Sequence, residues 1–146
     1  MKRLFVLIVC LATLVGFSRI EAHACTCSLP LWNLTLKQQV KKAQKESQAV
    51  SVGEVMQILE TTEGLSRSVK FRVENVWKGK LSQEVTIFTG QGGGDCGFPF
   101  EVGAIYLVYA SGSNESLSTN RCGRTVPRSE DGDLKLLGKG KPPLKE

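Results

Sequence analysis

The chain has 146 residues, a net charge of +5 and a single histidine, His23, close to its start. We expect that histidine to be removed with a leader, which excludes a Ser-His-Asp or Cys-His nucleophile pair and a histidine-ligated catalytic zinc. The remaining charge is only mildly basic, so composition does not predict a nucleic-acid or membrane-surface partner. We therefore expect a protein that is not an enzyme.

The first segment has the pattern of a secretory signal peptide. A basic start is followed by an apolar run over residues 4–17 and by an Ala-His-Ala cleavage pattern at residues 22–24. The run is shorter than the about 20 apolar residues that a membrane span needs. We expect residues 1–24 to be removed, so that Cys25 begins a secreted protein, extracellular or periplasmic. Roughly 120 residues then remain, enough for one domain with a buried core.

Four cysteines follow the leader: Cys25, Cys27, Cys96 and Cys122. An even number in a secreted domain predicts two disulfides, for which three pairings are possible. A zinc site of four cysteines is the alternative, but the oxidising compartment and the wide spacing of the last two favour disulfides. Lipidation of Cys25 is a further alternative, although Ala-His-Ala is a poor lipobox because position 22 lacks a leucine or valine and His23 is unfavourable.

The next segment predicts one helix and then strands. Thr35 and Gln38 form a Thr-x-x-Gln capping box, which predicts a helix that runs to about Ser47. Alternation of apolar and polar residues then predicts strands over residues 49–59 and 68–77, with a bulge or sharp bend at Gly53 in the first. Three shorter strands follow at residues 84–88, 104–110 and 117–120, of which the second is apolar on both faces and should be central.

The order of these elements indicates the fold class. Five short strands, one early helix and no alternation of strands with helices predict a mainly β fold, a five-stranded Greek-key barrel of the OB-fold type. We expect a short C-terminal helix within residues 129–137, which completes a domain of residues 25–137. Residues 138–146 have no core-forming pattern and predict a flexible tail. We do not expect an OB-fold that binds nucleic acid, because basic and aromatic residues are not interleaved along the strands.

A glycine-rich loop at residues 89–97 separates the third and fourth strands. It has neither of the glycine spacings of phosphate-binding loops and no helix after it, so we expect glycines that let the backbone turn tightly beside Cys96. Asn33 and Asn114 begin Asn-x-Thr/Ser sequons, which matter only if the source glycosylates its secreted proteins.

Several short motifs together resemble a known family. They are Cys25-Thr26-Cys27-Ser28 at the mature start, Val52-Gly53, Trp77-Lys78-Gly79, Cys96-Gly97-Phe98, Gly103 and Cys122. In combination they resemble the inhibitory, netrin-like N-terminal domain of the tissue inhibitors of metalloproteinases, over the region from Cys25 to about Leu137. The resemblance is strongest to the short single-domain relatives, and it implies an OB-fold with disulfides Cys25–Cys96 and Cys27–Cys122.

The resemblance also implies a function. The α-amine and carbonyl of Cys25 would chelate the catalytic zinc of a secreted metalloprotease, and this zinc would be the only metal involved, since no cofactor of the protein's own is implied. The other residues implied to contact the protease are Thr26, Cys27, Ser28, Leu29, Pro30, Asp95 and Cys96. The alternative is a secreted, netrin-like binding or adaptor domain without inhibitory activity, whose Cys-x-Cys serves only as a structural anchor. We expect a monomer under either hypothesis.

Overall fold

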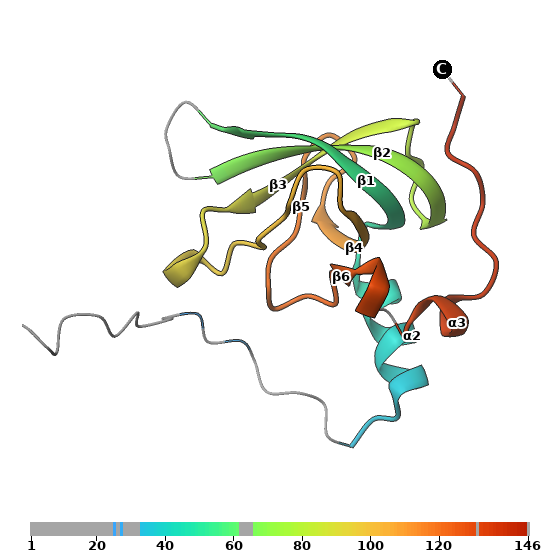
Figure 1. Ribbon diagram of the computed structural model, residues 1–146. Coiled ribbons are helices and arrows are strands. Elements are labelled where there is room, and N and C mark those ends of the chain that lie inside the picture. The colour runs from blue at the N-terminus through green and yellow to red at the C-terminus, as the bar shows by residue number, and fades with distance from the viewer. Residues whose placement is uncertain (1–24, 26, 28–32, 62–65, 131, 146) are drawn as a thin grey trace, which may run out of the picture.

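The computed structural model describes residues 25, 27, 33–61, 66–130 and 132–145 (Figure 1). Its helices are α2 (Leu36–Glu46) and α3 (Leu134–Leu137), with short 3-10 turns η1 (Gly93–Asp95) and η2 (Arg128–Glu130). Its strands are β1 (Ala49–Glu60), β2 (Ser66–Lys78), β3 (Glu84–Gly90), β4 (Ile105–Gly112), β5 (Leu117–Ser118) and β6 (Val126–Pro127). In the described part of the chain, no helix is long and apolar enough to cross a membrane.

The strands close into a barrel. The strand order is β1-β2-β3-β5-β4, and an additional pairing of β1 with β4 joins the two ends. β3 and β5 run parallel, whereas the other barrel pairs are antiparallel. This closed, five-stranded, mainly β architecture with a helix before the strands is OB-like, which confirms the predicted fold class. The short β6 was not predicted, and it pairs antiparallel with β4 on the edge of β4 that does not pair with β1.

The first strand makes closure possible by pairing on both of its edges. Residues 49–54 pair with β4 while residues 50–60 pair with β2, and the β1–β2 register shifts between Val52 and Gly53. A Cβ atom at Gly53 would lie 2.7 Å from the carbonyl oxygen of Arg72 on β2. Only glycine permits this close approach, and the register shift confirms the irregularity predicted at Gly53.

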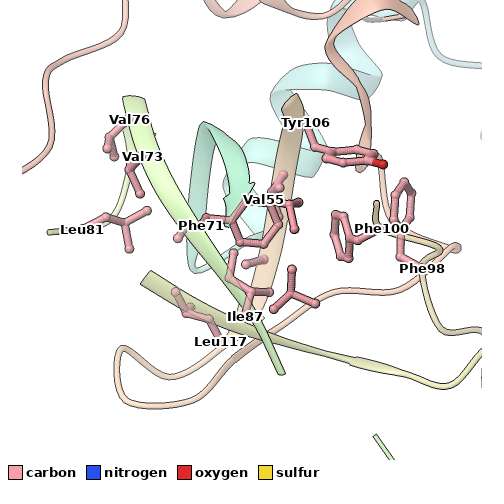
Figure 2. Close-up of a cluster of buried hydrophobic side chains, with 14 residues drawn as sticks. Val55, Phe71, Val73, Val76, Leu81, Ile87, Phe98, Phe100, Tyr106 and Leu117 are labelled. Atoms are coloured by element: carbon pink, nitrogen blue, oxygen red, sulfur yellow. The ribbon is translucent and has the colours of Figure 1, made fainter. Parts of the chain in front are cut away.

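The barrel interior is filled by one cluster of apolar side chains, drawn in Figure 2. An aromatic group dominates one part of it: the Phe100 ring packs edge-on against Phe71 and Tyr106, with ring centroids 5.2 and 4.9 Å apart. Phe98 joins the group, with its ring centroid 4.6 Å from that of Phe100. Edge-to-face aromatic pairs of this kind contribute about 0.5–1.5 kcal/mol each beyond the area that they bury. The segment that follows Cys96 is therefore anchored in the core.

A second apolar cluster lies on the outer side of β1 and β4. Its buried members are Val50, Val52, Leu107 and Tyr109, and they are covered by side chains from α2, β2, β4, β6 and α3. The helix α2 begins as predicted, with a capping box. The Thr35 hydroxyl accepts a hydrogen bond from the Gln38 backbone amide, and the Gln38 side chain accepts one from the Thr35 backbone amide. β4 is thus buried on both faces, which confirms its predicted central position.

The C-terminal segment, for which the sequence predicts a flexible tail, makes backbone hydrogen bonds to β2 and to the residues that follow it. Val76 and Lys141 exchange two backbone hydrogen bonds of 2.8 Å, and the Leu144 amide donates to the Leu81 carbonyl, also at 2.8 Å. The Trp77 indole N–H donates to the Gly138 carbonyl at 2.8 Å. These contacts use the backbone of the tail, so a search for apolar side chains could not reveal them.

A buried polar network joins the C-terminal region to the barrel. The Asp133 side chain is 6% exposed, and its carboxylate accepts two hydrogen bonds from the guanidinium of Arg124 and one from the Tyr109 hydroxyl. Burial and the neighbouring Asp133 carboxylate raise the pKa of Tyr109 well above its ordinary value, so the phenol remains a hydrogen-bond donor. The buried charge of Asp133 is therefore both paired and hydrogen-bonded.

We predict that Asp133→Asn lowers the free energy of unfolding by about 1.5–3 kcal/mol, because it replaces charge-assisted hydrogen bonds in a buried site. Urea denaturation measures the change. Glu74→Gln is the matched control: it removes a carboxylate from the ion pair with Arg128, whose side chains are 35% and 47% exposed. That exposed pair should contribute no more than about 1 kcal/mol. Equal effects of the two substitutions would contradict a stabilising role for the network.

Candidate functional site

Two disulfides tie the start of the described chain to two loops of the barrel. Cys25 is bonded to Cys96 in the β3–β4 loop, and Cys27 is bonded to Cys122 in the loop between β5 and β6, both with Cα–Cα distances of 5.1 Å. The two bonds lie side by side, since the sulfurs of Cys25 and Cys122 are 3.9 Å apart. This is the pairing that the resemblance implies, and it is confirmed.

The arrangement also bears on the alternative of a cysteine zinc site. The sulfurs of Cys25, Cys96 and Cys122 all lie within 4.8 Å of one another. Each is already part of a disulfide, however, and zinc binds the thiolate form of cysteine. The closeness of these sulfurs therefore reflects two adjacent disulfides, and the disulfide prediction is confirmed over the metal site.

Asp95 organises the glycine-rich loop that carries Cys96. Its carboxylate accepts hydrogen bonds from the backbone amides of Gln91 at 2.6 Å, Gly92 at 2.8 Å and Gly97 at 3.0 Å. These bonds, that of Gly97 first, hold the pKa of Asp95 below its ordinary value of 3.8. The amides that could have held a phosphate thus bind the loop's own carboxylate, in agreement with the structural role expected for the loop.

Two glycines let the loop fold back on itself. A Cβ atom at Gly97 would overlap the carbonyl of Gly90, and one at Gly90 would overlap the Asp95 carboxylate. Cys96, between them, has a φ angle of 57°, in the left-handed region that costs a residue with a Cβ about 1–2 kcal/mol. The close contacts at both glycines and the hydrogen bonds of Asp95 hold Cys96 in this conformation.

Arg121 connects the two loops that carry the disulfides. Its backbone amide donates to the Cys96 carbonyl at 2.8 Å, and its side-chain Nε donates to the Gly97 carbonyl at 3.1 Å. Beside it, the Asn120 side-chain oxygen accepts hydrogen bonds from the backbone amides of Cys122 and Gly123, at 2.9 and 3.2 Å. No sequence motif indicates Arg121 or Asn120, because Arg121 acts through a long-range contact and Asn120 through a local turn.

The structure brings together four of the predicted site residues: Cys25, Cys27, Asp95 and Cys96. Asp95 is exposed, but its carboxylate is engaged within the loop rather than free for a partner. The other predicted contact residues, Thr26, Ser28, Leu29 and Pro30, lie outside the described residues. Comparison with models of protein families and with curated proteins finds no match for this chain.

We predict that the three amide hydrogen bonds to Asp95 are lost together on acidification. The pKa of Asp95 is lower in the folded loop than its ordinary value of 3.8, so its stabilising effect is complete above that value and is lost as the pH falls below it. The NMR shifts of the Gln91, Gly92 and Gly97 amides should move with one shared midpoint below pH 3.8. Asp95→Asn should abolish this transition. A midpoint above 3.8 would contradict the hydrogen-bonded carboxylate.

We also predict that Gly97→Ala disturbs the Cys25–Cys96 disulfide, since the added methyl group overlaps the Gly90 carbonyl. The free energy of unfolding should fall by about 1–3 kcal/mol, and mass spectrometry after thiol alkylation should find reduced or mispaired cysteines. Gly132→Ala is the matched control, because a Cβ at Gly132 has no described atom within 4 Å. If both variants oxidise and unfold alike, the close approach at Gly97 is not required.

Proposed function

We propose that the protein is secreted and inhibits a zinc metalloprotease, with Cys25 as the amino-terminal residue whose α-amine and carbonyl bind the zinc of the protease. The observation that carries this proposal is the pair of adjacent disulfides. They attach Cys25 and Cys27 to two loops that Arg121 joins at one place on the barrel. The motifs that resemble the tissue inhibitors of metalloproteinases, Cys25-Thr26-Cys27-Ser28 above all, supply the chemical role.

Rigid attachment is what a chelating chain end needs. A free amino terminus would lose its conformational freedom on entering an active site, and that loss would weaken binding. The disulfides span 71 and 95 residues of sequence. In the chain-entropy model, closing loops of this length stabilises the fold by about 4 kcal/mol each, less any strain. The ordering of Cys25 thus occurs during folding and need not be repeated on binding.

The chemistry of the first residue suits the open position of a catalytic zinc. An α-amine nitrogen and the carbonyl oxygen of the same residue form a five-membered chelate, which displaces the water that the protease would activate. An α-amine has an ordinary pKa of about 7.7–8.0, so a useful fraction is unprotonated near neutral pH and can bind metal. In this proposal Thr26 and Ser28–Pro30 would extend along the substrate-binding groove of the protease.

We predict that one alanine added before Cys25 abolishes inhibition, because the α-amine then lies one residue away from the carbonyl of Cys25. Protein that starts at Cys25, verified by mass spectrometry, should inhibit at least one member of a panel of secreted zinc proteases. The extended form should be at least about 100-fold weaker, because loss of a metal ligand should cost at least as much as loss of an outer-shell partner, which typically costs about 10–100-fold. An alanine added after Glu146 is the matched control and should change nothing.

The thermal midpoint and the disulfide pairing of all three forms should agree, which separates loss of chelation from misfolding. Equal inhibition by the native and extended forms would overturn the role of the amine. Inactivity of both against the whole panel would overturn inhibition and favour a netrin-like binding or adaptor domain, in which the two disulfides only anchor the chain end.

A further inference from the structure

A pocket lies where the C-terminal tail crosses the end of β2. Its volume is about 490 Å³, within the range of about 300–1,000 Å³ that small-molecule sites occupy. It is lined by Gln44 of α2, by residues 76–81 at the end of β2 and beyond, by Leu137 and by tail residues 139, 141, 142 and 144. None of these residues belongs to the loops that carry Cys96 and Cys122, so the pocket is separate from the disulfide site.

The lining combines apolar and positively charged side chains. The apolar part consists of Val76, Trp77, Leu81, Leu137, Pro142 and Leu144. The charged part consists only of lysines, namely Lys78, Lys80, Lys139 and Lys141, and no described lining residue is acidic. Such a surface is complementary to a molecule that carries both an apolar body and a negative charge.

Three of the four lysines are available to a ligand. Lys78 is engaged, since its ammonium donates to the carbonyls of Gln44 and Lys45 at the end of α2. The ion pairs formed among the described residues include none of Lys80, Lys139 and Lys141, and their side chains make no hydrogen bond there. Within the described part of the chain, no carboxylate forms an ion pair with any of these three ammonium groups.

The tail that forms one wall is held in place by its own contacts. The Trp77 indole donates to the Gly138 carbonyl, and Lys141 pairs with Val76 through the backbone. A Cβ atom at Gly140 would lie 3.1 Å from the Trp77 ring, so glycine allows the tail to pass close to the indole. The pocket is thus formed before any ligand arrives, which reduces the cost of binding.

We propose that this pocket binds a small amphipathic anion, a molecule with an apolar body and a single carboxylate or sulfonate group. A small hydrophilic anion would leave the apolar lining in contact with water. An uncharged apolar molecule would leave the lysines without a counter-charge. Only a ligand with both properties uses the whole lining, and the inference does not depend on protease inhibition.

The test uses dodecanoate as the ligand and the full mature protein. Titration followed by NMR should shift the Trp77 indole N–H resonance in a saturable manner. Replacing Lys80, Lys139 and Lys141 together with glutamine should weaken binding at least about tenfold, because the charge-assisted contacts are lost. The matched control replaces Lys37, Lys41 and Lys135 with glutamine, because these lysines do not line the pocket. It removes the same net charge and should weaken binding less than about twofold.

Two further ligands define what would overturn the proposal. Dodecanol has the same apolar body without the charge, and inorganic sulfate has charge without the apolar body, so both should bind much more weakly than dodecanoate. Equal binding of dodecanol would mean an apolar site that does not recognise charge. Three other results would each reject the proposed site. Sulfate could bind as well as dodecanoate, or the two triple variants could have equal affinities for dodecanoate. The third result is the absence of a saturable shift of the Trp77 resonance at millimolar dodecanoate.

Discussion

The pairing of β1 with two neighbours at once is the constraint on which the rest of the structure depends. Residues 49–54 hydrogen-bond to β4 on one edge while most of the same residues hydrogen-bond to β2 on the other. This requires the strand to bend, and Gly53 permits the bend because a side chain there would meet the backbone of β2. Once β1 closes the barrel, the inward side chains have a closed interior to fill and the loops gather at its ends.

The candidate site follows from this closure in a short series of steps. The parallel pairing of β3 with β5 places the loops that follow these strands near each other. Arg121 then joins the two loops through the carbonyls of Cys96 and Gly97. Asp95 fixes the fold of the first loop, because its carboxylate accepts hydrogen bonds from three backbone amides of that loop. The disulfides use this platform to hold Cys25 and Cys27, so the rigidity of the chain end derives from the barrel.

Glycines in two irregular segments allow close approach of the backbone, and the sequence indicates this role for only one of them. The loop at residues 89–97 was expected to serve close approach rather than phosphate binding, and the contacts of Gly90 and Gly97 agree with this. The segment over residues 138–146 is rich in lysine and proline, and its lack of a core-forming pattern predicts a flexible tail. Its backbone makes hydrogen bonds with Val76 and Leu81, and Gly140 allows it to pass beside Trp77. Composition alone does not reveal the contacts of the second segment, since they depend on which atoms its backbone meets in the folded chain.

The sequence by itself determined the elements whose signals are local. The capping box of Thr35 and Gln38, the alternation along β1 and β2, and the two-faced apolar pattern of β4 each depend on neighbours within a few residues. The resemblance to a known family added the disulfide pairing. Only the tertiary structure decided the short β6, the course of the tail, and the roles of Arg121 and Asp133. These depend on partners that lie far away in the chain or on main-chain atoms, which have the same chemistry at nearly every position and therefore leave no mark in the sequence.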